Sequence, residues 1–283
     1  MSEQLEVKDA YTIDESSFPY IYEENIAVPL KTSSKGIIRC NVYRPKATKE
    51  GTKLPVLVTY GPYGKDIHYK DFHGKSFGEV NPEHHSDHSA WETPDPGFWT
   101  KHDYVIVRAD ERGLGQSPGF LDTMSRGTSE CFFDVVEWAA EQPWSSGKVG
   151  LLGISYYAGS QWRVAARKPK GLAAVIPWEG MSDYYRDRCR HGGILSNKFI
   201  DFWWYVCPKH VVFSDAHEHL VGTDRSSPTS MVARVAQSET GDLTLSMATF
   251  QKKYARRTDK TRLSIPLRTG SATNNTMRAR STI

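Results

Sequence analysis

The sequence has 283 residues, of which 39% are hydrophobic and 12% aromatic, and this composition excludes a chain that is disordered throughout. The formal net charge of +3 is too small to indicate a nucleic-acid partner, and the four cysteines are too far apart to form a metal or disulfide pattern. The N-terminus lacks the apolar core of a signal peptide, and no apolar run approaches the roughly 18 residues of a membrane helix. We therefore expect a cytoplasmic protein with no membrane partner.

Strand and helix patterns alternate along the chain. We expect residues 1–19 to be a loose arm, followed by a hairpin of two strands at Tyr20–Pro29 and Gly36–Arg44. Continuous apolar runs then predict strands buried on both faces, separated by helix-compatible segments. The later predicted strands are 54–60, 104–108, 149–154 and 172–177, with helices at 127–141 and 156–167. This order predicts a doubly wound α/β fold, with a mostly parallel sheet and flanking helices.

Residues 66–96 interrupt this alternation with a long irregular segment rich in histidine. His84, His85 and His88 surround Asp87, a group that could suggest a metal site. Their spacing matches no ordinary ligand pattern, so we expect a solvated loop and no bound metal.

Three polar side chains follow the C-terminal ends of predicted strands. They are Tyr63, Asp110 and Ser155. Because ligands of open α/β sheets bind beyond the carboxyl ends of the strands, we expect all three at one edge of the sheet.

Ser155 lies where an apolar strand changes directly into a helix. That arrangement is typical of a nucleophile elbow, in which the first backbone N–H groups of the helix can stabilise an oxyanion. Gly153 and Ser155 fit the pattern G-x-S-x-G, but Tyr157 occupies the second glycine position. The alternative is a serine that caps the helix it precedes.

Several further motifs resemble, in order, those of the cocaine esterase and Xaa-Pro dipeptidyl-peptidase (CocE/NonD) group of α/β-hydrolases. The resemblance runs from about Asn25 to about Tyr185. It rests on Asn41-Val-Tyr-Arg-Pro, Pro62-Tyr63-Gly-Lys65, Asp110-Glu-Arg112-Gly-Leu-Gly-Gln-Ser-Pro-Gly119, Gln142-Pro-Trp-Ser145 and Gly153-Ile-Ser-Tyr156. It implies an α/β-hydrolase core over residues 20–180 and the start of a helical cap over 181–221, where 183–205 reads as one or two helices.

The resemblance also implies roles for individual residues. Ser155 would be the nucleophile, and the backbone N–H of Tyr156 and the hydroxyl of Tyr63 would be the oxyanion donors. The alternative for Tyr63 is a tyrosine that only packs its ring. Asp110 and Arg112 would form a charge-assisted pair beneath the site. The implied substrate is a small ester, amide or short peptide, cleaved through an acyl-serine without a cofactor or metal.

A serine nucleophile needs a base, which in this fold is a histidine oriented by a carboxylate. The compact candidates are Asp215, His217 and His219, although a solvated segment explains them as well. Nothing beyond residue 205 resembles the strands that would carry the acid and base. We therefore expect a chain truncated within its cap, and the alternative function is a catalytically inactive fragment of the fold.

The last 62 residues, 222–283, differ from the rest in composition. They hold 11 Lys and Arg against 4 Asp and Glu, and 19 are Ser or Thr. Such a segment buries too little apolar surface to offset its ordering entropy, so we expect it to be disordered. Few aromatic residues accompany the basic ones, which makes nucleic-acid binding a weaker explanation than a solvated tail.

Overall fold

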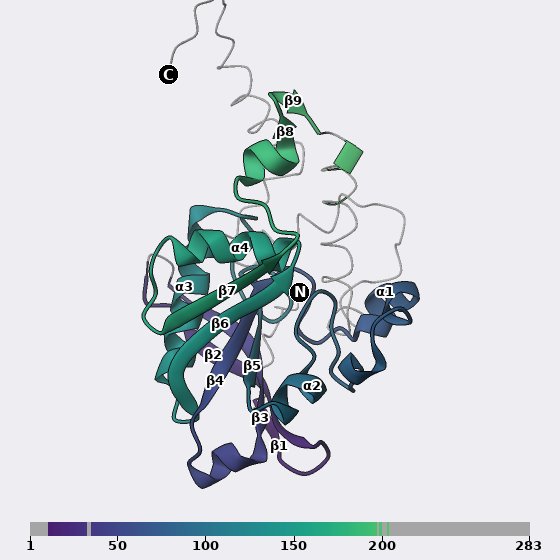
Figure 1. Ribbon diagram of the computed structural model, residues 1–283. Coiled ribbons are helices and arrows are strands. Elements are labelled where there is room, and N and C mark those ends of the chain that lie inside the picture. The colour runs from purple at the N-terminus through teal and green to yellow at the C-terminus, as the bar shows by residue number, and fades with distance from the viewer. Residues whose placement is uncertain (1–10, 33–34, 197, 200–202, 204–283) are drawn as a thin grey trace, which may run out of the picture. The chain divides into compact units, whose positions relative to one another are not determined.

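A computed structural model describes residues 11–32, 35–196, 198, 199 and 203 (Figure 1). The chain divides into two compact units, Met1–Ser227 and Pro228–Ile283, and every described residue belongs to the first. The predicted tail at 222–283 and most of the predicted cap therefore lie outside the described residues. Among the described helices, none is both long and apolar enough to cross a membrane.

A seven-stranded sheet forms the centre of the fold, in the order β1-β2-β3-β5-β4-β6-β7. Strands β5, β4, β6 and β7 are parallel neighbours, whereas β1, β2, β3 and β5 pair in antiparallel fashion. This topology confirms the predicted α/β class with parallel strands at its centre. The strands are β1 (Thr12–Asp14), β2 (Tyr20–Pro29), β3 (Ile37–Pro45), β4 (Leu54–Gly61), β5 (Val105–Asp110), β6 (Ser145–Ile154) and β7 (Leu172–Trp178).

The predicted hairpin is present as β2 and β3, and β1 adds a short strand to it. Residues 12–14 fall inside the segment predicted as a loose arm, but they pair with Tyr22–Glu24 of β2. Phe18 also packs against a buried cluster of the sheet. A three-residue strand is too short for a hydrophobic period to be recognised, which is why the pattern did not reveal it.

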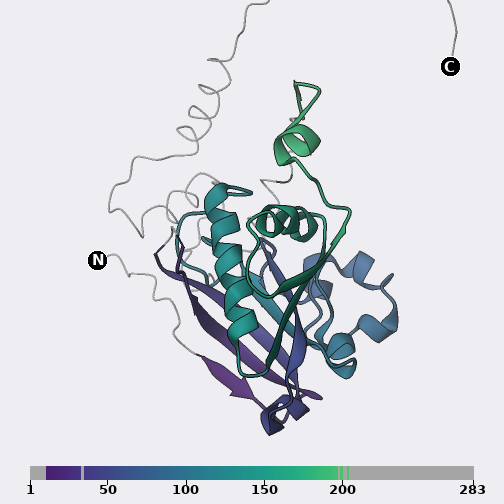
Figure 2. The same cartoon turned by 60° about the vertical axis from the view of Figure 1, so that its left-hand side comes forward.

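Helices cover the two faces of the sheet unequally (Figures 1 and 2). Helices α3 (Arg126–Glu141) and α4 (Tyr156–Ala165) lie on one face, where Val135 and Val164 join the main core with Val58, Val107 and Leu151 of the strands. Helix α2 (Pro96–Lys101) contacts β3 and β5, and its Trp99 packs on a second cluster that includes Tyr43, Leu57 and Ile106.

The segment at 66–96 is more ordered than the sequence predicted. It contains α1 (Tyr69–Phe77) and a short 3-10 turn, η2 (Pro82–His84). Helix α1 buries no residue and is interrupted by non-helical angles at His73, so it carries no clear amphipathic pattern.

The histidines of this segment pack instead of lying in solvent, which corrects the prediction of a solvated loop. The ring of His85 stacks on Phe77 with centroids 4.1 Å apart, and that of His84 lies 4.0 Å from Phe98. His88 hydrogen-bonds the hydroxyl of Tyr20 at 2.7 Å. Within the described ranges, no three His, Cys, Asp or Glu side chains are arranged to hold a metal ion.

In the range 183–205, where helices were predicted, residues 185–195 differ from the prediction, whereas the described residues 198, 199 and 203 are helical. A π-helical turn, η3 (Tyr185–Cys189), leads into a small hairpin of β8 (Arg190–His191) and β9 (Ile194–Leu195). Gly192 and Gly193 connect these strands with φ values of 59° and 90°, and such a two-residue turn favours glycine at both positions. The Gly-Gly pair was the signal for this hairpin.

Candidate active site

The turn at Ser155 has the geometry of a nucleophile elbow. Strand β6 ends at Ile154, helix α4 begins at Tyr156, and Ser155 between them has φ 56° and ψ −111°. A positive φ is costly for a residue with a Cβ and persists where neighbouring contacts enforce it. Here the backbone N–H of Ser155 donates to Trp178, and that of Ile154 donates to Glu92. The Ser155 side chain makes no capping hydrogen bond, so the alternative of a capping serine is wrong.

Close packing of α4 on the sheet explains the glycine before the serine. A Cβ added at Gly153 would lie 2.4 Å from the Cβ of Tyr157, closer than two carbons can approach. Ala158, on the first turn of α4, is fully buried. Its methyl group faces Gly180, at which a Cβ would lie 3.0 Å away. The missing side chain at Gly180 makes room for the alanine.

Ser155, Tyr63 and Tyr156 line one narrow pocket, whereas Asp110, which the sequence predicted at the same edge as Tyr63 and Ser155, is not among its described lining residues. Its volume of about 10 Å³ corresponds to about one water molecule. The remaining wall is aromatic except for a thioether and one guanidinium. The lining residues are Tyr63, Ser155, Tyr156, Met181, Tyr184, Arg188, Phe199 and Trp203.

Tyr63 is buried, and its side chain both packs and hydrogen-bonds. Its ring centroid lies 5.5 Å from that of Tyr157 and 5.6 Å from that of Phe72. Its hydroxyl accepts a hydrogen bond from Nε1 of Trp203 at 3.3 Å. A phenol oxygen that accepts one hydrogen bond can also donate its own proton. The same Trp203 ring stacks on Tyr156, with centroids 5.7 Å apart.

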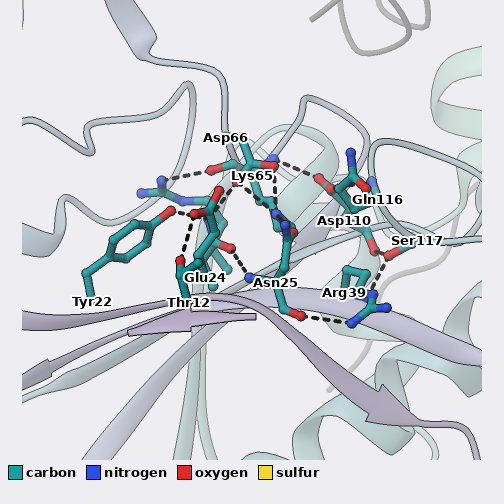
Figure 3. A network of polar contacts seen from close by, with 12 residues as sticks. Thr12, Tyr22, Glu24, Asn25, Arg39, Lys65, Asp66, Asp110, Gln116 and Ser117 are labelled. Carbon is teal, nitrogen blue, oxygen red and sulfur yellow. Dashed lines mark hydrogen bonds and ion pairs between the residues drawn. The ribbon is translucent and has the colours of Figure 1, made fainter. Parts of the chain in front are cut away.

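A buried ionic network holds the turn that carries Tyr63 (Figure 3). The ammonium group of Lys65, whose side chain is fully buried, donates to Asp66 and to Oδ1 of Asn25, each at 2.6 Å. The backbone N–H of Lys65 donates to Asp110 at 2.7 Å. Burial opposes the charged form of Lys65, but Asp110 and Asp66 outweigh it and raise the pKa of this lysine.

The partners of Asp110 differ from the prediction. Its carboxylate accepts hydrogen bonds from the backbone N–H groups of Lys65 and Gln116 instead of pairing with Arg112. Burial raises the pKa of Asp110 to about 6, against the effect of Lys65. A Cβ added at Gly115, where φ is 52°, would meet this carboxylate at 2.1 Å, so the loop can close around Asp110 because residue 115 is a glycine.

Glu111 anchors the side chain of Tyr156 and was missed by the sequence reasoning. Its Oε1 accepts hydrogen bonds from the hydroxyls of Tyr156 and Thr128, both at 2.9 Å. The Tyr156 hydroxyl also accepts from the backbone N–H of Met124 at 3.2 Å. Glu111 is fully buried, and burial raises its pKa from 4.5 to about 7. No local sequence pattern signals this role, because its partners Tyr156 and Thr128 are distant from Glu111 in the sequence.

A second carboxyl group that sequence reasoning missed, Glu92, lies behind the elbow. Its carbonyl oxygen accepts from the N–H of Ile154 at 3.2 Å. Burial raises the pKa of its side chain to about 8, a hydrogen bond involving Trp91 opposes the rise, and Glu179 adds to it. In the part of the chain that the structure describes, its buried Oε2 atom has no hydrogen-bond partner.

The acid and base candidates Asp215, His217 and His219 lie outside the described residues. His191 is described, but it is exposed and its Nε2 atom contacts the carbonyl of Asp187 at 2.6 Å. Of the described residues that line the Ser155 pocket, none is a histidine. The described residues therefore place Ser155 in one pocket with Tyr63 and Tyr156, and that described lining includes no histidine to act as its base.

A family model described as "X-Pro dipeptidyl-peptidase (S15 family)" matches residues 37–269 of this chain. The match continues well beyond Tyr185, where the resemblance seen in the sequence motifs ended. It includes most of the basic segment, which the sequence reading had set apart from the family.

Similar proteins include hydrolases of known name. The chain is 28% identical over 169 residues to the cocaine esterase of Rhodococcus sp., covering 59% of this chain and 25% of that protein. It is 28% identical over 208 residues to the Xaa-Pro dipeptidyl-peptidase of Lacticaseibacillus paracasei, covering 57% and 26%. The crystal structure of a CocE/NonD family hydrolase from Staphylococcus aureus is 34% identical, with a TM-score of 0.58, covering 71% of this chain and 36% of that one. These matches confirm the α/β-hydrolase fold, and the chain spans about a quarter of the length of both curated relatives.

Proposed function

The chain belongs to the X-Pro dipeptidyl-peptidase (S15) family, and on that premise we propose that it acts as a serine hydrolase with Ser155 as its nucleophile. The proposed reaction is cleavage of an ester or amide, including short peptides, because the similar proteins are named as an esterase and a dipeptidyl-peptidase. The observation that carries the proposal is the elbow at Ser155, strained and uncapped, in one pocket with Tyr63.

In the proposed mechanism, the Ser155 oxygen attacks the carbonyl carbon while a base takes its proton. The carbonyl oxygen becomes an oxyanion, which would accept hydrogen bonds from the N–H of Tyr156 and the hydroxyl of Tyr63. The bond to the leaving alcohol or amine then breaks, and the leaving group takes the proton. Water then attacks the acyl carbon while the base takes its proton, the bond to the Ser155 oxygen breaks, and that oxygen regains the proton. The first N–H groups of a helix have no intrahelical partner, which supports the role of Tyr156.

The proton acceptor is a further part of the proposal. A serine hydroxyl is weakly nucleophilic without a base, and the residues of this chain left as candidates are His217 or His219, oriented by Asp215. Replacing each histidine by glutamine would test them. Loss of Ser155 reactivity in one variant would identify the base, and retention in both would exclude these histidines.

Labelling with a fluorophosphonate tests the proposed nucleophile. Covalent modification of Ser155, located by mass spectrometry in folded protein and absent in Ser155→Ala, would support the proposal. Folded protein in which Ser155 stays unmodified would refute it.

A catalytically inactive domain of this fold is the second candidate. It is favoured by the described pocket, whose lining includes no histidine, and by the edge strand β7, on which Ile176 and Trp178 are exposed. An exposed sheet edge promotes association, so this candidate predicts a weak thermal transition or aggregation together with unlabelled Ser155. A sharp melting transition of labelled monomer would exclude it.

A further inference from the structure

Arg188 contributes the one guanidinium to the described lining of the Ser155 pocket. It belongs to η3 and is half-buried, with its guanidinium carbon 5.4 Å from the ring centroid of Phe199. Within the part of the chain that the structure describes, Arg188 has neither a hydrogen bond nor an ion pair. A guanidinium offers several N–H donors in a planar fork, so this one has unused binding capacity.

Three other arginines of the described chain have printed partners, in contrast to Arg188. Arg186, two residues earlier on the same turn, forms an ion pair with Asp183 at 2.8 Å. Arg167 pairs with Glu130 at 3.4 Å, and Arg108 donates to the carbonyl oxygen of His88 at 2.9 Å. Burying part of a cation without a partner is unfavourable, and such a group gains most from a ligand of opposite charge.

The described lining of the Ser155 pocket includes no carboxyl side chain. The carboxyl group of Glu92 interacts with Arg188, but burial raises the pKa of Glu92 to about 8, so it is mostly protonated there. Several of the other side chains of the pocket, including Tyr184, Phe199 and Met181, are apolar or neutral. An anionic group entering beside Ser155 would therefore meet a cation in a largely apolar wall.

We propose that Arg188 binds a carboxylate of the substrate, so that the preferred ester or amide carries a negative charge close to its scissile bond. The planar guanidinium matches a carboxylate with two parallel hydrogen bonds, whereas a neutral substrate would leave it unpaired. This inference rests on the proposed function, because it assigns a substrate class to the pocket of Ser155. The carboxylate can belong to the acyl part or to the leaving group, and substrates of both kinds separate these cases.

Reversible boronic acids provide a direct test. Boron accepts an electron pair from a serine oxygen, so phenylboronic acid reports the neutral affinity of the pocket and 3-carboxyphenylboronic acid reports the anionic one. The quantity to measure by calorimetry is the ratio of the two dissociation constants. We expect the carboxylated compound to bind the unmodified protein about tenfold more tightly, and this preference to shrink as salt is added.

Three variants assign the preference to one side chain. Arg188→Gln should reduce the ratio to about one, and Arg188→Lys, which keeps the charge but loses the fork, should give an intermediate value. Arg186→Gln is the matched control, because Arg186 is on the same turn but exposed and paired with Asp183. It should keep the ratio of the unmodified protein. A ratio near one in the unmodified protein, or the same ratio in Arg188→Gln, would overturn the inference.

Failure of the proposed function has a separate signature. If neither boronic acid binds, Ser155 is not a reactive nucleophile. The anion site is then tested without Ser155, by comparing the binding of benzoate and benzamide in ligand-observed NMR. A benzoate preference that is lost in Arg188→Gln would support the anion site alone, and equal binding would refute it. If both boronic acids bind, two pairs of ester substrates show where the preferred carboxylate lies. Nitrophenyl esters of succinate and butyrate test the acyl part, and butyrate esters with and without a carboxylated phenol test the leaving group.

Discussion

Replacing Tyr63 by phenylalanine tests the oxyanion assignment, because it removes one hydroxyl and leaves the ring. The ring is buried and contacts Phe72, Tyr156 and Tyr157, and these contacts persist in the variant. The hydroxyl lost is the acceptor of the Trp203 hydrogen bond at 3.3 Å. One such neutral bond contributes about 1 kcal/mol to folding, so the melting temperature should fall by about 2–4 °C.

The expected effect on acylation is larger. Removing one oxyanion donor typically reduces the rate by about 10²–10³, or roughly 3–4 kcal/mol of transition-state stabilisation. The loss of rate therefore exceeds the loss of stability about threefold in free energy. If Tyr63 only packs its ring, the variant should show the same small change in stability and almost no change in the acylation rate.

The assay is the second-order rate constant for fluorophosphonate labelling of Ser155, measured beside the melting temperature. Tyr69→Phe is the matched control, since its hydroxyl contacts Ser76 at 3.2 Å on α1, and Tyr69 is not among the lining residues of the pocket. Ser155→Ala gives the background. A labelling rate for Tyr63→Phe within about threefold of the unmodified protein would refute the oxyanion role, because a lost donor should cost far more.

Three more substitutions probe the supports of the site. Gly153→Ala should destabilise the fold by about 1–3 kcal/mol in urea unfolding, because its Cβ would lie 2.4 Å from that of Tyr157, and a neutral result would mean that α4 can move. Lys65→Met should cost about 3–5 kcal/mol, since it removes the ammonium that pairs with Asp66 and offsets the charge of the buried Asp110, and unchanged stability would show that this cation is dispensable. Glu111→Gln should change the pH dependence of stability. The folded pKa of Glu111 is raised from 4.5 to about 7, so the unfolded chain loses this proton first, and the carboxyl costs folding free energy as pH rises between those values. The stability of the glutamine variant relative to the unmodified protein should therefore grow by up to about 3 kcal/mol across this window, and parallel pH curves would contradict the raised pKa.

Sequence alone determined the central architecture and one point of the site. The apolar runs of β4, β5 and β6 are continuous because these strands are covered on both faces, and this pattern is local enough to recognise. The serine between β6 and α4 follows from the same local change of period. Since strands of a parallel sheet end at a common edge, Tyr63 and Ser155 could be expected together before any coordinates.

Tertiary structure alone decided which groups support that site. Glu111 meets Tyr156 across 45 positions, Glu92 reaches the elbow across about 60, and Asp110 takes backbone N–H groups in place of the expected Arg112. Arg188 enters the pocket by way of a π-helical turn where helices were expected. Short-range patterns reflect the burial of one face of an element, but hydrogen bonds and charges between distant segments depend on how the loops close. The raised pKa values of Glu111 and Glu92 likewise arise from burial, which exists only once the chain has folded around them.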